Sequence, residues 1–422
     1  MVPEERVYLN RRDFLKMGSV AAGAALLGPA ARRLAAGAEV DEVLTLPFKG
    51  DLLRRQSGEL LLLGRGLLAS TSQDGGRSWS RPEIVLNHGE PVRSDSHVLG
   101  LERLASGRIA LAYGRMQPVN GLQRQEIFLR LSDDDGRSWS EEKSVTPLPW
   151  DDLHALHGSL IQLRSGRLLL PAYTHFAHDY VGRPRGIGHT WLPEYCATHM
   201  LLSDDEGETW EPTGALFLWK ELGHGGLVSC EEPCVAETRD GRLLMLARTT
   251  NMRLLRSYSE DGGASWSLVE LTDISSSNAP ARLVRLPSSG DLLIVWNQAT
   301  ADEHRRGFGR SRLSASVSKD SGATWEHFRS LELCPGMDPR SRLVDPEPPG
   351  FVRTGESTHP GQVPDNPARG IVRASYPNVH VVDGKVWVDH DHWLTPNLWA
   401  GAEERREVCQ RLHVLPVEWF YS

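Results

Sequence analysis

Residues 132–139 read SDDDGRSW, and the pattern Ser-x-Asp-x-Gly-x-Ser/Thr-Trp that they contain occurs five times in the chain. The other copies are SQDGGRSW at 72–79, SDDEGETW at 203–210, SEDGGASW at 259–266 and SKDSGATW at 318–325. Each copy has the parts of a β-turn, because the Asp carboxylate can accept backbone N–H groups, the Gly can adopt a positive φ and the Trp can pack beneath the turn. Five matches to one pattern indicate a fold built from a repeated unit.

A second pattern alternates with the first: a short turn that ends in Gly and leads into an apolar run. It occurs six times, at Ser57-Gly58, Ser106-Gly107, Ser165-Gly166, Asp240-Gly241, Ser289-Gly290 and Asp383-Gly384. Six such hairpins alternating with five Asp-containing turns predict an all-β fold, a six-bladed β-propeller of four-stranded antiparallel blades whose last blade lacks the Asp turn. We expect the propeller to span residues 39–422, with the Pro-rich stretch 326–370 as a strandless loop.

The eight-residue pattern resembles the Asp-box, and its recurrence resembles the BNR repeats of the sialidase (neuraminidase) superfamily. The resemblance covers about residues 45–420. It implies that the box is a structural turn between the third and fourth strands of a blade, with no catalytic or calcium-binding role. It also implies a glycoside hydrolase.

The N-terminus has the composition of an export signal. Arg11 and Arg12 precede a short apolar run of small residues, 17–31, which resembles a twin-arginine signal. Ala36-Gly37-Ala38 offers a cleavage site, so residues 1–38 are predicted to be the signal peptide. The protein would then be exported folded by the twin-arginine machinery to the periplasm or beyond. No other apolar run is long enough to predict stable membrane insertion.

Composition narrows the possible partners. The 422 residues include 55 acidic and 47 basic side chains, a formal charge of −8, so no overall basic field favours nucleic acid. The five cysteines are too scattered for a disulfide framework or a spaced zinc site. Cys230 and Cys234 are expected on one face of a strand as small buried residues. We expect neither cofactor nor metal.

Blade topology places the binding site. The connections between strands 2 and 3, and between blades, lie at one end and hold the length variation, so the site is expected in the funnel at that end. The first strands of the six blades begin there with Lys49, His97, His157, Glu232, Arg282 and Tyr376. The second strands end there with Arg65, Arg115, Tyr173, Arg248, Asn297 and Asp391. These polar groups are costly to bury unless they pair with each other or with a ligand, and several arginines, with Arg310 or Arg312, could converge on an acidic carbohydrate.

The sialidase resemblance assigns roles to some of these residues. Glu231-Glu232-Pro233 with Arg248 resembles the segment that bears the catalytic Glu and the second arginine of the carboxylate-binding triad. Arg312 resembles the third arginine, and Ser375-Tyr376-Pro377 stands where the nucleophilic Tyr is expected.

Two positions depart from the sialidase pattern. Phe48-Lys49-Gly50-Asp51 replaces the motif that carries the first arginine of the triad. The ammonium group of Lys49 therefore stands where a guanidinium, which can bind both oxygens of a carboxylate, is expected. The segment 66–71 contains no acid where the sialidase acid/base Asp is expected, which leaves Asp95, His97 or His157 as proton donors.

Three functions therefore remain open. The first is a secreted sialidase-type hydrolase of a terminal acidic sugar. The second is a polysaccharide lyase in which His157 or His97 and Tyr376 or Tyr173 move protons on a uronate glycan. The third is a non-catalytic carbohydrate-binding propeller.

Overall fold

The computed structural model divides the chain into two units, residues 1–40 and 41–422, and the fold described here is that of the second unit. The structure describes residues 42–84, 96–119, 122–146, 153–154, 159–175, 196–214, 216, 218–219, 227–228, 230–249, 253–277, 279–300, 302–303, 308–340, 342, 371–395 and 405–422. The predicted signal peptide, 1–38, lies outside them.

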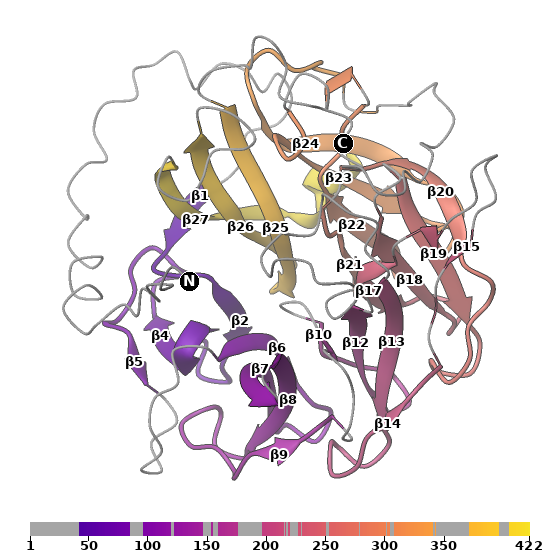
Figure 1. The fold of residues 1–422 in the computed structure, drawn as a ribbon. Helices are drawn as coiled ribbons and strands as arrows, with labels where there is room; N and C mark the ends of the chain where they lie inside the picture. Colours follow the sequence, from indigo (N-terminus) through magenta and orange to yellow (C-terminus); the bar gives the residue numbers. More distant parts are fainter. Residues whose placement is uncertain are drawn as a thin grey trace, which may run out of the picture. The chain divides into compact units, whose positions relative to one another are not determined.

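The predicted six-bladed β-propeller of antiparallel sheets is confirmed, and the first three blades follow one another along the chain (Figure 1). Blade 1 contains β2 (Gly50–Arg54), β3 (Leu60–Gly64), β4 (Leu68–Ser72) and β5 (Glu83–Ile84). Blade 2 contains β6 (His97–Arg103), β7 (Ile109–Val119), β8 (Leu122–Ser132) and β9 (Lys143–Ser144). Blade 3 contains β12 (Leu168–His175), β13 (Cys196–Ser203) and β14 (Glu211–Pro212), with two short strands, β10 (Leu153–His154) and β11 (Ile161–Gln162), that both pair with β12.

The remaining blades complete the ring. Blade 4 contains β17 (Glu231–Glu237), β18 (Leu243–Arg248), β19 (Arg253–Ser259) and β20 (Glu270–Ser275). Blade 5 contains β21 (Arg282–Arg285), β22 (Leu292–Trp296), β23 (Arg312–Ser318) and β24 (Glu326–Leu333). Blade 6 contains β25 (Ile371–Val382), β26 (Lys385–Thr395), β27 (Arg406–Pro416) and β1 (Glu42–Leu46). The smaller elements are the β15 (Leu218–Trp219) and β16 (Leu227–Val228) pair and the 3-10 turns η2 (Arg65–Leu67) and η4 (Val417–Tyr421).

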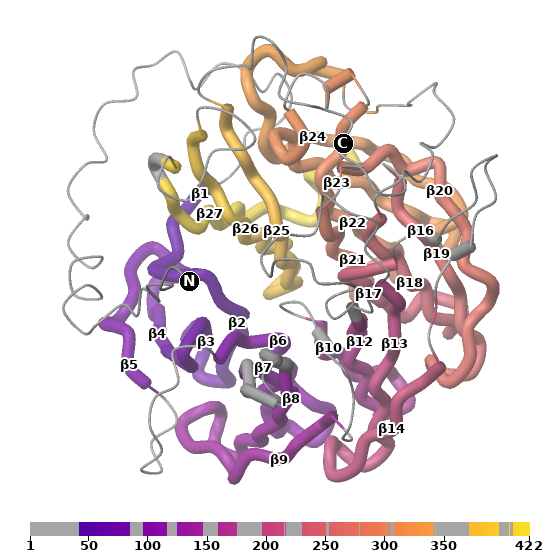
Figure 2. The backbone as a smooth tube through the Cα atoms, in the orientation of Figure 1, coloured from indigo at the N-terminus to yellow at the C-terminus, as the bar shows by residue number. Residues whose placement is uncertain are grey.

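The first described strand closes the ring. β1 pairs antiparallel with β27 as the outer strand of blade 6, so the indigo start of the tube in Figure 2 lies against its yellow end. The innermost strands contact one another around the axis, with β2 against β6 and β25. Because both faces of these blades are covered by neighbours, strands such as β3, with Leu60 to Leu63 all buried, are continuously apolar.

The repeated turns join neighbouring blades. In the second copy, the Oγ of Ser132 accepts from the Gly136 N–H at 2.8 Å, and Asp134 Oδ1 accepts from the Ser138 N–H at 2.7 Å. Gly136 has a φ of 79°, and a Cβ there would lie 2.9 Å from Leu61 of blade 1. Only glycine satisfies both the positive φ and this close approach, so each turn packs against the preceding blade.

One sequence prediction about the fold is wrong. The stretch 326–370 is not strandless throughout, because residues 326–333 form β24, the outer strand of blade 5. β24 is mostly half-buried and carries polar residues, so it lacks the apolar run that signals an inner strand. Among the described residues, no helix has the length and apolarity needed to cross a membrane.

Candidate active site

Two inner strands carry matching irregularities in their pairing. The pairing of β17 with β18 shifts register within 231–234, and that of β25 with β26 shifts within 375–378. Glu232 and Tyr376 lie in these bulges, and each precedes a proline, which lacks the N–H that a sheet ladder requires. Their φ values are 48° and 55°, a left-handed conformation that costs a non-glycine residue about 1–2 kcal/mol. Backbone strain of this kind is concentrated at functional sites.

The bulge in β17 also separates the two neighbouring cysteines. Cys230 shares an apolar cluster with Leu169 of blade 3, whereas Cys234 shares one with Leu283 of blade 5. The prediction of a common strand face is therefore wrong, because the bulge inserts an extra residue between them. The prediction of small buried residues is confirmed: both thiols are free and buried, and burial raises the pKa of each to about 12.

Glu232, Tyr376 and Arg248 meet across blades 4 and 6. The Tyr376 hydroxyl donates to Glu232 Oε1 at 3.4 Å, and Arg248 Nη1 donates to Glu232 Oε2 at 2.6 Å. Arg248 is fully buried, and its Nε lies 3.5 Å from Glu231 Oε1. Burial by itself would lower the pKa of Arg248, but Glu231 and Glu232 raise it well above its usual value. The guanidinium therefore offsets two buried carboxylates and holds Glu232 against Tyr376.

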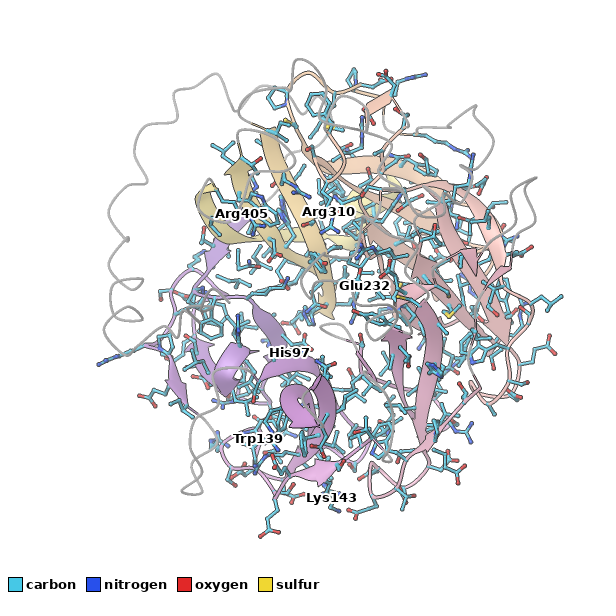
Figure 3. All side chains as sticks on the ribbon, viewed as in Figure 1. His97, Trp139, Lys143, Glu232, Arg310 and Arg405 are labelled. Carbon is cyan, nitrogen blue, oxygen red and sulfur yellow. The ribbon has the colours of Figure 1, made fainter. Side chains whose placement is uncertain are left out.

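Two further cations contact the Tyr376 ring. Lys49 Nζ lies 4.5 Å from the ring centre, and the guanidinium carbon of Arg310 lies 5.1 Å from it. Lys49 also donates to Asp391 Oδ2 at 2.9 Å, and its side chain is 30% exposed. Figure 3 shows Glu232 and Arg310 on the inner sides of blades 4 and 5. Positive charge thus surrounds the phenol, as in a site for an anion.

Tyr173 lies beside the same carboxylates. Tyr173 lies on β12 of blade 3, which contacts β17, and its side chain is buried. Burial raises its pKa well above the usual value, and the nearby charge of Glu232 adds to the effect. Tyr173 therefore stays a neutral phenol next to Glu232.

The comparisons with known proteins agree with the propeller fold and with the export signal. The sequence profile of the BNR repeat-like domain matches residues 66–388. The chain belongs to the BNR repeat-like domain family. The profile of the twin-arginine translocation pathway signal sequence matches residues 9–28, so the predicted export signal is confirmed, whereas cleavage after residue 38 stays a prediction.

Relatives of this BNR protein include sialidases. Human Sialidase-3 is 32% identical over 177 residues, which cover 37% of this chain and only 36% of that protein. A protein of unknown function from Dyadobacter fermentans has a similar fold, with a TM-score of 0.54 and 17% identity over 89% of this chain and 98% of that one. The NanB sialidase of Streptococcus pneumoniae superposes with a TM-score of 0.53 and 13% identity over 89% of this chain and 71% of that one. At these identities the structures show a shared sialidase-like fold.

Three residues predicted for the site of this BNR protein bind other partners. Arg115 donates to both carboxylate oxygens of Glu142, at 3.0 and 3.1 Å, in blade 2. Arg312 is fully buried and donates to Glu303 at 2.6 Å. The Asn297 amide donates to two backbone carbonyls, one in blade 5 and one in blade 6. All three have structural partners that the tertiary fold brings to them, and their roles in ligand binding stay predictions.

The remaining predicted residues divide into two groups. His97 begins β6 with its Nε2 next to the side-chain amide of Gln125, and Arg65 is exposed in η2. The connection 65–67 contains no acid, in agreement with the departure noted in the sequence. Asp95 and His157 lie outside the described residues.

Two arginines close to Arg310, namely Arg373 and Arg405, were not predicted from the sequence. Arg373 and Arg405 both lie over the Trp393 ring, with guanidinium carbons 5.3 and 4.9 Å from its centre. Burial, together with the charges of Arg310 and Arg405, lowers the pKa of Arg373 to about 9. Arg310, Arg373 and Arg405 come from three separate segments of the chain, so no spacing in the sequence could have grouped them.

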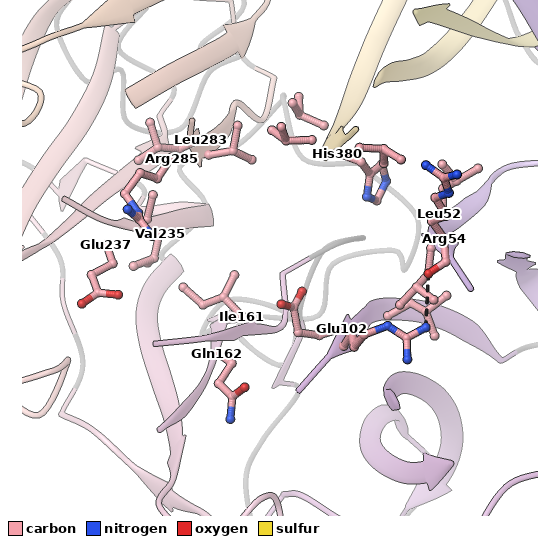
Figure 4. Close-up of a pocket in the computed structure, with 18 of the residues that line it drawn as sticks. Leu52, Arg54, Glu102, Ile161, Gln162, Val235, Glu237, Leu283, Arg285 and His380 are labelled. Carbon is pink, nitrogen blue, oxygen red and sulfur yellow. Dashed lines mark hydrogen bonds between the residues drawn. The ribbon is translucent and has the colours of Figure 1, made fainter. Parts of the chain in front are cut away.

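A cavity lies at the opposite end of the channel, away from Glu232 and Tyr376. It has a volume of about 590 Å³ and is lined by the ends of the inner strands, such as Leu52, Val235 and Leu283. Glu102 and His380 face into it (Figure 4). Burial raises the pKa of Glu102 to about 8, with Asp51 adding to the effect. Neither Glu232 nor Tyr376 lines this cavity, so it is separate from the candidate active site.

Proposed function

We propose that this protein is an exported sialidase-type glycoside hydrolase that acts on a terminal acidic sugar in the periplasm or outside the cell. The observation that carries the proposal is the contact between Tyr376 and Glu232, 3.4 Å from hydroxyl to carboxylate, with Lys49 and Arg310 against the phenol ring. A nucleophile within hydrogen-bond reach of a base, with the base held by a third group, is the arrangement of an activated nucleophile. Here Arg248 is the third group.

The reaction would proceed in two displacements. Glu232 takes the phenolic proton as the Tyr376 oxygen bonds to the anomeric carbon, and the bond from that carbon to the leaving oxygen breaks. The leaving oxygen takes a proton from an acid at the rim, for which His97 is the described candidate. Water then attacks the anomeric carbon and loses a proton to a base, while the bond from that carbon to the Tyr376 oxygen breaks. The Tyr376 oxygen takes back the proton that Glu232 holds. Two inversions retain the anomeric configuration.

The substrate carboxylate would bind the cations around Tyr376. Arg310 and Lys49 contact the phenol ring, and Lys49 is partly exposed, so both stand close to the reacting carbon. Arg248 already pairs with Glu231 and Glu232, so its first role is to position the base. An anionic sugar is favoured over a neutral one because it offsets the mutual repulsion of these cations.

The variant Tyr376→Phe tests the proposal. It keeps the ring that Lys49 and Arg310 contact but removes the phenolic oxygen, so turnover on the best sialoside or uronoside should fall by orders of magnitude while binding changes little. Tyr258→Phe, which removes a hydroxyl from half-buried β19, is the matched control and should keep full turnover. Equal turnover of the wild type and Tyr376→Phe would exclude the nucleophilic Tyr.

A polysaccharide lyase is the second candidate, favoured by the three-residue connection in blade 1 that has no acid. A lyase breaks the glycosidic bond by removing the proton next to a uronate carboxylate, so His97 or Tyr173 would serve as base or acid. Its product contains a carbon–carbon double bond and absorbs in the ultraviolet, whereas a hydrolase product does not. Binding of acidic glycans with neither product would instead identify a carbohydrate-binding propeller.

A further inference from the structure

A cluster of histidines and a carboxylate lies between blades 5 and 6. Glu332 comes from β24, His390 from β26 and His413 from β27, so three strands of two blades contribute one side chain each. We propose that these three residues bind a divalent metal ion of the zinc type. No residue of the Glu232–Tyr376 cluster belongs to this group.

The distances fit a metal centre. His390 Nε2 and His413 Nε2 are 3.1 Å apart, and Glu332 Oε1 lies 3.5 Å from the first and 3.2 Å from the second. A tetrahedral ion with bonds of about 2.0–2.1 Å separates its ligand atoms by about 3.3 Å. An ion slightly above the plane of these three atoms therefore reaches all of them without a change of rotamer.

The histidine tautomer also fits. His390 Nδ1 lies 3.0 Å from the backbone carbonyl of Asp391, an acceptor that keeps the hydrogen on Nδ1. Its Nε2 then presents a lone pair to His413 and Glu332. Histidines that ligate metals are oriented in this way by a second acceptor.

The cluster is largely enclosed by protein. The side chain of His390 is fully buried, that of His413 is 3% exposed and that of Glu332 is 11% exposed. Two imidazole nitrogens 3.1 Å apart must share one proton or repel each other through their lone pairs. An ion removes this conflict, and two nitrogens with one oxygen is a ligand set typical of zinc.

Arg411 modulates the site. Its Nη1 donates to Glu332 Oε1 at 2.8 Å, and its side chain is 32% exposed. A carboxylate oxygen has two lone pairs, so Oε1 can accept from Arg411 and bind the ion. The guanidinium charge opposes the ion, so Arg411→Gln should tighten metal binding.

The position of the site gives it a structural consequence. β27 is the strand that pairs with β1 to close the ring, and His413 lies in that pairing opposite Val43. His390 lies opposite the bulge of Tyr376 on β25 and directly precedes Asp391, the partner of Lys49. A bound ion would therefore fasten blade 5 to the closing blade and stiffen the strand behind the active site.

Metal binding is tested on full-length, untagged protein treated with a chelator. Zn²⁺ titration calorimetry should show a high-affinity ion, Zn²⁺ should raise the thermal midpoint, and Co²⁺ should give the intense visible absorption of a tetrahedral site. His413→Asn and Glu332→Gln should each weaken this binding about a hundredfold or more. His327→Asn, on the same strand as Glu332 but outside the cluster, is the matched control and should bind as the wild type does.

Two results would overturn the proposal. One is wild-type protein that binds no ion, and the other is His413→Asn that binds Zn²⁺ and Co²⁺ as tightly as the wild type. If the variants fail to fold, wild-type crystals soaked in Zn²⁺ decide: anomalous scattering between His390 and His413 supports the site, and its absence there refutes it.

Discussion

Replacing Glu102 by Gln should stabilise the protein at neutral pH and leave its stability near pH 4.5 unchanged. The Glu102 carboxyl is enclosed by the inner strands, and burial raises its pKa to about 8 from an ordinary value of 4.5. The charge of Asp51 contributes to this increase, and the charge of Arg282 opposes it. In the folded state the group therefore stays protonated over a pH range in which the unfolded chain has already released the proton.

The sign of the effect follows from this difference. Between pH 4.5 and 8 the unfolded chain binds fewer protons at this position than the native protein, so the contribution of Glu102 to stability is lost as pH rises. At about 1.4 kcal/mol per pKa unit, a gap of about 3.5 units amounts to at most about 5 kcal/mol above pH 8. Glu102 faces the 590 Å³ cavity, where water would partly solvate the carboxylate and reduce the cost of its ionisation. We therefore expect Glu102→Gln to raise the free energy of unfolding by about 2–3 kcal/mol at pH 7.

Urea denaturation at pH 4.5, 6, 7 and 8 measures this prediction. Gln cannot ionise, so the free energy of unfolding of Glu102→Gln should exceed that of the wild type by an amount that grows with pH and levels off above pH 8. The control Glu83→Gln removes a carboxyl from exposed β5 and should show no such trend. A difference between Glu102→Gln and wild type that is the same at pH 4.5 and pH 8 would refute the buried, protonated carboxyl.

Three other changes probe export, fold and specificity. Replacing Arg11 and Arg12 by Lys should leave folded protein in the cytosol, as fractionation and immunoblotting would show, and unchanged export would contradict the signal. Asp134→Ala removes the acceptor of four hydrogen bonds, two of them from Ser138 at 2.6 and 2.7 Å, and should lower the free energy of unfolding by about 1–3 kcal/mol with turnover per folded molecule nearly unchanged. Selective loss of turnover in folded Asp134→Ala would place that turn at the active site. Lys49→Arg keeps the charge beside Asp391 and offers a planar guanidinium that can bind both oxygens of a carboxylate, so binding of an acidic sugar should be preserved or tightened in calorimetry. Weaker binding would mean that the site needs a point charge.

Part of the candidate site could be predicted because equivalent positions in the blades can be counted from the hairpin glycines. Counting from the hairpin glycines places Glu232 and Tyr376 at equivalent positions of two blades, and the structure brings their side chains within 3.4 Å. The same counting could not predict the partners of Arg115 and Arg312. A register places a Cα atom, but a long guanidinium turns toward the nearest carboxylate, here Glu142 and Glu303, and only the fold decides which carboxylates are near.

The sequence alone determined the number of blades and the nature of their turns. Every group that makes the turn at 132–139 lies within eight residues, so hydrogen bonding and positive φ are local properties that a pattern can reveal. Only the tertiary structure decided that β1 closes the ring with β27, and that Glu332 meets two histidines from another blade. These contacts join segments far apart in the chain, and their partners are selected by packing and burial, which leave no periodic signal in the sequence.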